Sequence, residues 1–451
     1  MSLSLKYLRP LEECRNLVIA KRVARKYMDD RFKPIPREER NSLQKGYLNF
    51  YGSKITSPYI PLAASGPWII TNENTIVYDV GGYGMLGFGH NDKNALCIMS
   101  KPQTMANIMT PSYSQQKFYD LFQKETNYKY SKIVCLNSGS EANTFAYRIA
   151  NAHKKLNPVV VCLEDSFHGR TEAPSLLSNS CMSVYRKYLW DYKNHKMSTN
   201  LYNKSIYTVK PNSIKSLEDT FRKIKERKEY PELTIFEPVM GEGKPGLSIT
   251  PDFYKRMREL TKKSGGILLA DSVQSGFRCK GELSITNYPN FTELDPPDME
   301  SFSKALNGGQ YPFSVVAMND KSVHNYREGL YGNTMSSNPR ALDLAANIIE
   351  KMTPRVKKNI VDQGNYFYMM LCNLCKKHEI IKDVGGTGLL LSLFLDKKKI
   401  KNLDAEMGLR LRGLNVIHGG SNSLRFTPWF LISRIEIDMI GSLMDDYFSS
   451  L

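Results

Sequence analysis

Two short apolar runs that end in charged residues constrain the fold of this chain of 451 residues more than any other feature. Residues 265–271 read GGILLAD, and residues 297–304 read PDMESFSK. Short apolar runs bounded by Gly and Pro are typical of interior strands in a parallel sheet. Because α/β folds bind ligands at the carboxyl ends of such strands, we expect Asp271 and Lys304 to meet in one crevice. A buried lysine there can lose its proton and attack a carbonyl carbon, and the alternative interpretation places both side chains on the surface.

Three further strand ends carry polar clusters. Residues 132–150 lead from an apolar run into Asn-Ser-Gly-Ser and then a helical pattern, and such a turn at a helix N-terminus can bind phosphate. Residues 159–171 place an aromatic ring, a histidine and an arginine after a strand end, and residues 234–246 place Glu237 and Glu242 after another. Strands and helices alternate through this region, which predicts a mostly parallel sheet with covering helices.

Seven sequence blocks resemble, in order, those of the class III pyridoxal-phosphate aminotransferases. They are NSGSEAN, FHGRT, EPVMGEG, LLADSVQSGF, SFSKALNGG, GNTMSSNP and SLRFTPWF. That family includes the ornithine, acetylornithine, lysine and 4-aminobutyrate enzymes. The resemblance implies a fold-type I α/β architecture, with a large domain whose mostly parallel sheet has helices on both faces and a smaller α+β domain made from both chain ends. We expect residues 1–75 and 336–451 to form the small domain and residues 76–335 to form the large cofactor-binding domain.

The resemblance implies which residues hold pyridoxal 5'-phosphate. Lys304 would form a Schiff base with the cofactor, and Asp271 would keep the ring nitrogen protonated so that the ring accepts carbanion electrons. Ser272 departs from the glutamate that usually follows this aspartate in relatives. The other implied contacts surround the phosphate and the ring, and Thr334 would reach the cofactor from the partner subunit of a homodimer. These residues are Ser138, Gly139, Ser140, Phe167, Gln274 and Thr334.

The resemblance also implies substrate-binding roles. Arg425 matches the arginine that holds the α-carboxylate, a task that suits its planar guanidinium. Glu242 matches an acid that can pair with this arginine and mask it while a distal amine reacts. Arg170 matches a second arginine, which binds the distal carboxylate of substrates such as 2-oxoglutarate. Tyr83 stands where ornithine enzymes place a pocket tyrosine, whereas Thr56 stands near the position of another.

The expected reaction is therefore transfer of an amino group from the distal amine of a diamino or ω-amino acid to 2-oxoglutarate. The donor stays open among ornithine, lysine, acetylornithine, 4-aminobutyrate and a diamine. A decarboxylase, racemase or aminomutase of the same fold would share Lys304 and Asp271 and is the alternative. We expect no metal site, because Cys372, Cys375 and His378 share one helical pattern without a second pair of ligands.

Composition limits the partners and the location that we expect. The net charge is +17, but the densest basic runs are mixed with acids or lie in turns, so we expect no nucleic-acid partner. A non-catalytic nucleic-acid-binding protein that holds the cofactor is the alternative. No apolar run approaches the ~20 residues that span a bilayer, and the first residues lack the apolar core of a signal peptide. Eight cysteines, mostly in apolar stretches, are typical of free thiols, and we expect a cytoplasmic protein with no membrane partner.

Local patterns predict several elements outside the central sheet. Alternating apolar residues in 68–80 predict a β-hairpin with its turn at 72–74, and a basic stretch over 11–26 predicts a helix. Helices are also expected over 251–263, 354–377 and 436–448, and strands within 388–395, 413–419 and 423–429.

Overall fold

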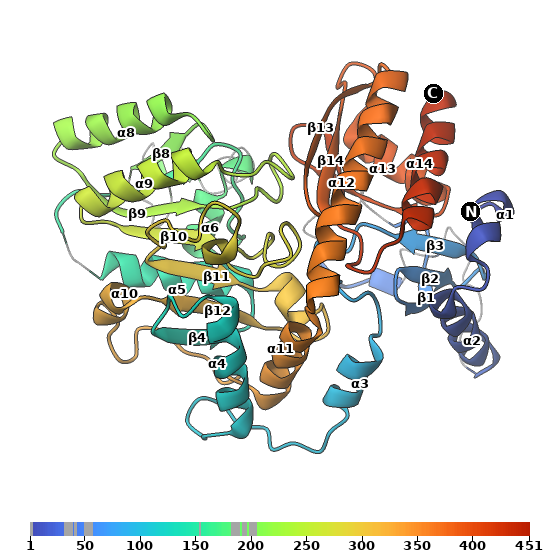
Figure 1. Cartoon of the computed structure of the whole chain (residues 1–451), viewed down its shortest axis with the longest axis horizontal. Coiled ribbons are helices and arrows are strands. Elements are labelled where there is room, and N and C mark those ends of the chain that lie inside the picture. The colour runs from blue at the N-terminus through green and yellow to red at the C-terminus, as the bar shows by residue number, and fades with distance from the viewer. Residues whose placement is uncertain are drawn as a thin grey trace. The chain divides into compact units, whose positions relative to one another are not determined.

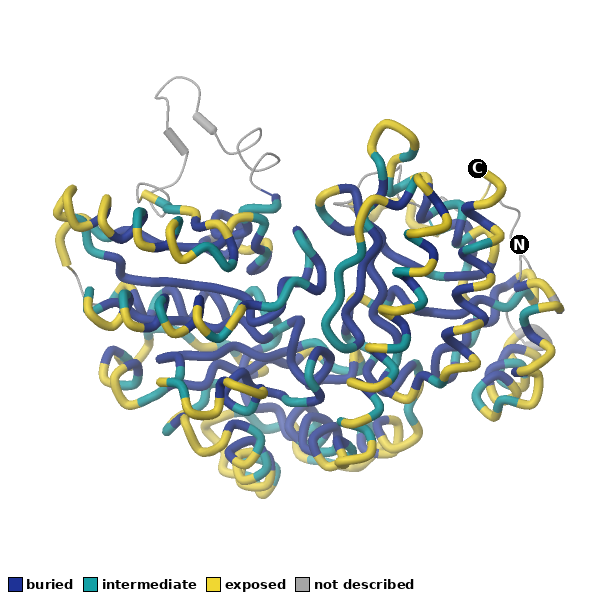
Figure 2. The backbone as a smooth tube through the Cα atoms, turned by 45° about the horizontal axis from the view of Figure 1, so that its top comes forward, coloured by how far each residue is buried: buried dark blue, intermediate teal, exposed yellow. Residues whose placement is uncertain are grey.

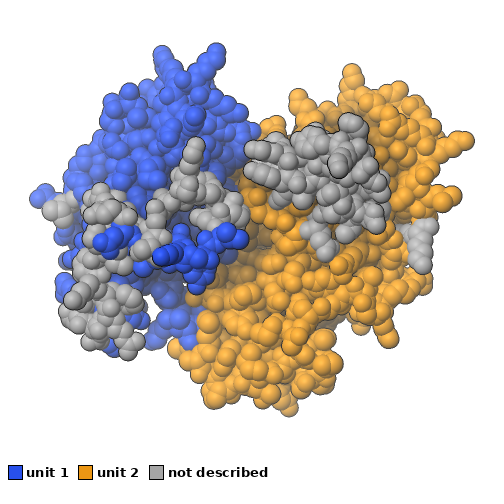
Figure 3. All heavy atoms as spheres, turned by 180° about the vertical axis from the view of Figure 1, so that it is seen from behind, with its two compact units in different colours: residues 1–96, 359–451 blue, residues 97–358 orange. Residues whose placement is uncertain are grey.

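The computed structural model divides into two compact units (Figure 3). Unit 1 comprises residues 1–96 and 359–451, and unit 2 comprises residues 97–358. The sequence placed the boundaries after residues 75 and 335. Strand pairing accounts for the first difference, because β3 (Ile76–Asp79) pairs with β15 (Leu414–Asn415) and so lies in unit 1. The structure describes residues 3–30, 39, 43–48, 57–152, 155–181, 190–191, 196–197 and 205–451.

Helix packing accounts for the second difference. Helix α11 (Pro339–Lys351) packs along α4 (Tyr113–Glu125), which keeps residues 339–351 in unit 2. Its first turn is set by the Asn338 side chain, which accepts a hydrogen bond from the N–H of Arg340, with Pro339 at the first helical position.

Unit 2 is built on a sheet whose described strands have the order β4-β12-β11-β10-β9-β5-β8 (Figure 1). Neighbouring strands from β11 to β8 are parallel, and β12 runs antiparallel to both β11 and β4. The mostly parallel sheet is thereby confirmed. The strands are β4 (Lys132–Leu136), β5 (Pro158–Leu163), β8 (Ile206–Val209), β9 (Tyr230–Phe236), β10 (Ile267–Asp271), β11 (Met299–Phe302) and β12 (Ser314–Met318).

Alternation along the strands buries the two faces of this sheet under different helices (Figures 1 and 2). On one face, α5 (Gly139–Asn151) covers a cluster that includes Ile267 and Leu269. On the other face, α8 (Ile214–Glu226) and α9 (Pro251–Lys263) pack, and the Phe236 ring lies 5.7 Å from the Tyr254 ring of α9. Each apolar side chain buried in this way stabilises the fold by about 1.5–3 kcal/mol. Because side chains alternate, Asp271 falls on the α5 face with Ile267 and Leu269.

Unit 1 contains two sheets among its described residues, with strand orders β1-β2-β3-β15 and β13-β14-β17-β16. The predicted hairpin is confirmed, because β2 (Trp68–Thr71) pairs antiparallel with β3 and the Thr71 carbonyl accepts from the Asn74 N–H across the turn. The parallel pairing of β3 with β15 joins the two ends of the chain in one α+β unit. The remaining strands are β1 (Pro61–Ser65), β13 (Ile381–Thr387), β14 (Leu390–Leu395), β16 (Ile417–Gly419) and β17 (Ser423–Phe426).

The helices follow the expected patterns closely. The bounds of α9 and α12 (Pro354–Lys377) match the prediction, and α14 (Arg434–Ser449) begins two residues early because Ser433 and Glu436 form a capping box. The basic helix, expected over 11–26, instead spans Arg15–Asp30 (α2), because Leu11 belongs to a 3₁₀ turn at Arg9–Leu11 that precedes it. In the part of the chain that is described, no helix is long and apolar enough to cross a membrane. The others are α1 (Leu5–Leu8), α3 (Lys93–Met99), α6 (Glu172–Leu177), α10 (Asp320–His324) and α13 (Asn402–Leu411).

Candidate active site

Asp271 ends strand β10 with its carboxylate buried and held from several sides. The side-chain amide of Asn143 on α5 donates to Oδ2 at 2.8 Å, and Nδ1 of His168 lies 2.7 Å from the same oxygen. The N–H of Val273 and the hydroxyl of Ser301 donate to Oδ1 at 3.1 and 3.4 Å. Asp271 is 3% exposed. These contacts fix the carboxylate on the α5 face, as the alternation of the strand requires.

Asn143 organises the site although its role could not be read from the sequence. Besides Asp271, its amide nitrogen donates to the carbonyl of His168 at 2.8 Å, and its oxygen accepts from Ser301 at 2.8 Å. One side chain therefore ties α5 to β11 and to the loop that follows β5. The available signal was an asparagine among the mostly apolar buried residues of a helical pattern.

Lys304 lies just beyond strand β11, close to the end of β10. Asp271 and Ser301 are partners in the parallel register of these two strands. Lys304 has a positive φ of 46°, a conformation that costs a non-glycine residue about 1 kcal/mol and that concentrates at functional sites. Its amine donates to Oε1 of Gln274, which is buried. The structure thus brings the side chains of Lys304 and Gln274 together, and Gln274 follows Asp271 by three positions in the chain.

The turn before α5 packs closely against the segment that follows β10. Ser138 is the N-cap, and its hydroxyl accepts from the N–H of Glu141 at 3.2 Å. A Cβ on Gly139 would lie 2.8 Å from the Val273 side chain, so glycine is needed where the two segments pass. The first N–H groups of a helix lack partners within it, and together with the helix dipole they favour an anion.

The loop after β5 presents Phe167 and Arg170. Nη2 of Arg170 lies 3.9 Å from Oε1 of Glu242, and its guanidinium carbon lies 5.4 Å from the centroid of the Phe167 ring. The backbone N–H of Arg170 donates to Oγ of Ser140 at 3.3 Å, which joins this loop to the start of α5. The two charged side chains are 35% and 27% exposed, so water screens their attraction to about 1 kcal/mol or less.

The remaining expected residues fall in different parts of the chain. Thr334 is exposed in a turn of unit 2. Arg425 and Tyr83 belong to unit 1, where Arg425 is buried on β17 opposite Ser392 of β14, and Tyr83 is 38% exposed with a φ of 53°. Thr56 lies outside the described residues.

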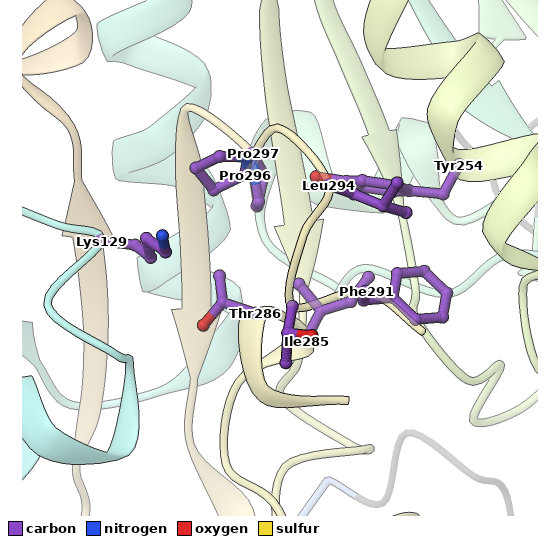
Figure 4. Close-up of a pocket in the computed structure, with 9 residues that line it drawn as sticks. Lys129, Tyr254, Ile285, Thr286, Phe291, Leu294, Pro296 and Pro297 are labelled. Atoms are coloured by element: carbon purple, nitrogen blue, oxygen red, sulfur yellow. The ribbon is translucent and has the colours of Figure 1, made fainter. Parts of the chain in front are cut away.

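Two other features of the chain stand apart from these residues. His378, which the sequence grouped with Cys372 and Cys375, lies with Nε2 2.7 Å from the Asp445 carboxylate. A small pocket of unit 2 has a mostly apolar lining that includes none of the expected site residues (Figure 4). Its lining residues are Lys129, Tyr254, Ile285, Thr286, Phe291, Thr292, Leu294, Pro296 and Pro297.

Comparison with known proteins gives one consistent family. The family model described as aminotransferase class-III matches residues 53–448. The acetylornithine aminotransferase of Prochlorococcus marinus is 26% identical over 430 residues, which cover 90% of this chain and 98% of that protein. The ornithine aminotransferase of Plasmodium yoelii yoelii is 25% identical over 395 residues, covering 84% of this chain and 89% of that protein. The solved structure of the ornithine aminotransferase from Toxoplasma gondii ME49 matches with a TM-score of 0.76 at 20% identity, covering 93% and 96%, and shows the same fold.

Proposed function

This chain belongs to the class-III aminotransferase family, and we propose that it moves the distal amino group of a diamino or ω-amino acid to 2-oxoglutarate. It is a pyridoxal-phosphate-dependent transaminase, so its substrates are an amino donor and a 2-oxo acid acceptor. The names of its relatives, which include ornithine and acetylornithine aminotransferases, support a distal amine. The observation that carries the proposal is the hydrogen bond from the Lys304 amine to Gln274, at the ends of the paired strands β10 and β11 where the carboxylate of Asp271 is buried.

The residues at these strand ends fit pyridoxal phosphate. Nε2 of Gln274 is buried next to the Lys304 amine and has no hydrogen-bond partner within the described part of the chain, so it offers a donor to a phenolic oxygen. Asp271 offers a fixed carboxylate to a protonated ring nitrogen, and the start of α5 at Gly139 offers N–H groups to a phosphate. When bound, pyridoxal phosphate supplies an aldehyde that condenses with amines and a ring that takes up an electron pair.

Lys304 is the proposed proton carrier of the site. Its Nζ would take a proton from the substrate carbon that bears the amine and deliver it to the carbon on the other side of that amine nitrogen, and this transfer requires that the lysine amine be neutral. Asp271 keeps the ring nitrogen protonated, and His168 and Asn143 hold its carboxylate in place during this transfer. The proposed contacts to the phosphate and the ring are those of Ser138, Gly139, Ser140, Phe167, Gln274 and Thr334.

The proposed substrate contacts are charged. Arg170 binds the distal carboxylate of the acceptor and Arg425 binds the α-carboxylate, because a guanidinium forms two parallel hydrogen bonds with a carboxylate. Glu242 is proposed to mask Arg425 while a donor reacts through its distal amine. Nη2 of Arg170 lies 3.9 Å from Oε1 of Glu242, so this acid also approaches the second proposed substrate arginine. Tyr83 is the proposed pocket residue for the donor side chain.

We also propose a cytoplasmic homodimer. Four large apolar side chains in one stretch of unit 2 are 52%, 64%, 82% and 92% exposed, and an exposed apolar patch of this kind is typical of an interface. They belong to Met105, Ile108, Met109 and Tyr113. All eight cysteines are free, which suits a reducing compartment. Sedimentation should give a dimer for the wild type and a lower mass for Met109→Glu, and a wild-type monomer at micromolar concentration would contradict the dimer.

The test of the reaction combines a substrate panel with a lysine variant. Ornithine, lysine, acetylornithine and 4-aminobutyrate are each incubated with 2-oxoglutarate, and glutamate is measured. Lys304→Ala should abolish turnover and the visible absorption of the bound cofactor. Lys321→Ala is the matched control, because Lys321 also follows a strand of unit 2 and burial lowers its pKa. Carbon dioxide release or racemised donor without glutamate would instead favour the decarboxylase, racemase or aminomutase alternative.

A further inference from the structure

Glu237 follows β9 and lies where two loops of the site meet. The loop that follows β5 carries Phe167, and the loop that follows β9 carries Glu242. We propose, on the basis of the function proposed above, that Glu237 is a positioning residue whose carboxylate ties these two loops together and holds them against the bound cofactor. The assignment concerns geometry and needs no contact between Glu237 and the substrate.

The tie consists of two short hydrogen bonds to backbone groups. The N–H of Phe167 donates to Oε1 of Glu237 at 2.9 Å, and the N–H of Gly241 donates to Oε2 at 2.8 Å. Glu237 is 2% exposed, so water does not compete for either oxygen. A buried charged acceptor forms stronger hydrogen bonds than a neutral one, and each oxygen faces a different loop.

The loop that follows β9 also packs against Gln274, the hydrogen-bond partner of Lys304. A Cβ on Gly241 would lie 2.6 Å from Cγ of Gln274, so the backbone at Gly241 packs directly against the side chain that accepts from Lys304. Any shift of the Gly241 backbone therefore changes the packing around the Gln274 side chain. A Cβ on Gly243 would lie 2.0 Å from the carbonyl oxygen of Asp165, which shows how closely the two loops interlock.

The charge of Glu237 determines how strong the tie is. Burial raises the pKa of this carboxyl to about 7, while His168 lowers the pKa and Asp271 raises it. The thiol of Cys279 is a further titratable group near Glu237, and the charge of Glu237 raises the pKa of this thiol. The ionised carboxylate accepts both N–H groups fully, whereas a proton on either oxygen weakens one of the two bonds. The loops are thus held firmly above pH 7 and loosely below it.

The experiment compares wild type, Glu237→Gln and Lys244→Ala as holoenzymes loaded with pyridoxal phosphate. Glutamine keeps the length of the side chain but turns an NH₂ group toward one of the two donors. Lys244→Ala removes a partly exposed ion pair with Asp165 at 3.1 Å, which joins the same two loops at the surface. The readouts are the visible circular dichroism of the bound cofactor from pH 6 to pH 8.5 and the rate at which the cofactor is released.

The wild type should gain circular dichroism as the pH rises through about 7, and Glu237→Gln should give a weak signal that changes little with pH. Release of the cofactor from Glu237→Gln at pH 8 should be about tenfold faster, equivalent to about 1.4 kcal/mol. Lys244→Ala should behave as the wild type does. A Glu237→Gln holoenzyme with the wild-type signal, pH profile and release rate would overturn the positioning role.

The proposed reaction can fail separately from this role. If the wild type binds the cofactor with the expected pH profile but forms no glutamate with any donor of the panel, the reaction is wrong and the tie stands. If glutamate forms but the cofactor bound to Glu237→Gln has the circular dichroism of the wild type, the positioning role of Glu237 is wrong and the proposed reaction stands.

Discussion

Replacing Glu237 by glutamine should change how the stability of the protein depends on pH. Burial raises the pKa of this carboxyl from its ordinary value of 4.5 to about 7. A difference of one in pKa corresponds to about 1.4 kcal/mol, so the folded protein favours the neutral carboxyl by about 3 kcal/mol. The side chain is 2% exposed, so solvent screening does not reduce this figure much.

The sign follows from proton binding. The folded state binds the proton of Glu237 more tightly than the unfolded state, so the bound proton stabilises the fold. This contribution is complete below pH 4.5 and is lost as the pH rises through about 7. Glutamine stays neutral throughout. The unfolding free energy of the wild type relative to Glu237→Gln should therefore fall by about 3 kcal/mol between roughly pH 4.5 and pH 8.

Urea unfolding of both proteins at a series of pH values measures this difference, because the free energy falls linearly with denaturant concentration. Other titrating groups are common to both proteins and cancel in the comparison. Lys244→Ala is the control, since its ion pair is more than a third exposed and should contribute about 1 kcal/mol or less. If the difference in unfolding free energy between the wild type and Glu237→Gln stays constant over this pH range, the reasoning from burial is wrong.

Four further substitutions test other parts of the structure. Asp271→Asn removes the charge that is proposed to keep the ring nitrogen protonated, and glutamate production should fall by roughly 10²-fold or more with the cofactor still bound. Glu242→Ala should raise kcat/KM for glutamate relative to ω-amino donors, and an equal loss of kcat/KM for all donors would contradict masking. Arg425→Ala should weaken use of 2-oxoglutarate by about 2–5 kcal/mol. Tyr130→Phe removes a 2.7 Å hydrogen bond to the buried carboxylate of Glu300 and should cost about 1–3 kcal/mol in urea unfolding, with unchanged cofactor absorption.

Local sequence patterns predicted the elements that carry the site. Apolar runs bounded by Gly and Pro predicted β10 and β11 with Asp271 and Lys304 at their ends, because strand length and flanking residues are local properties. The bounds of α9 followed in the same way from Pro251 at its start and the lysines at its end. The functional roles of these residues rest on resemblance and stay predictions.

The contacts that shape the site could not be predicted, because they join segments far apart in the sequence. Asn143 and Asp271 are separated by 128 positions, and Phe167 and Glu237 by 70. Periodicity reports which face of an element is buried and says nothing about the partner across that face. Glu300 is visible in the sequence as an acid within an apolar strand, which indicates that its carboxylate has buried polar partners. The structure supplies its partners, which include the hydroxyl of Ser272, the residue that departs from the glutamate usual in relatives.

The pairing of β3 with β15 has a consequence for biosynthesis. Asn415 donates to the carboxylate of Asp79 from 336 positions further along the chain, so unit 1 cannot close until its last segment has left the ribosome. Unit 2 is continuous from residue 97 to residue 358 and can fold as soon as it has emerged. The residues around Lys304 and Asp271 can therefore assemble before strand β15, which pairs with β3 of residues 1–96, has been synthesised. A nascent chain that stalls after unit 2 would already hold the contacts of Asp271 and Lys304, while its first 96 residues still lacked strand β15.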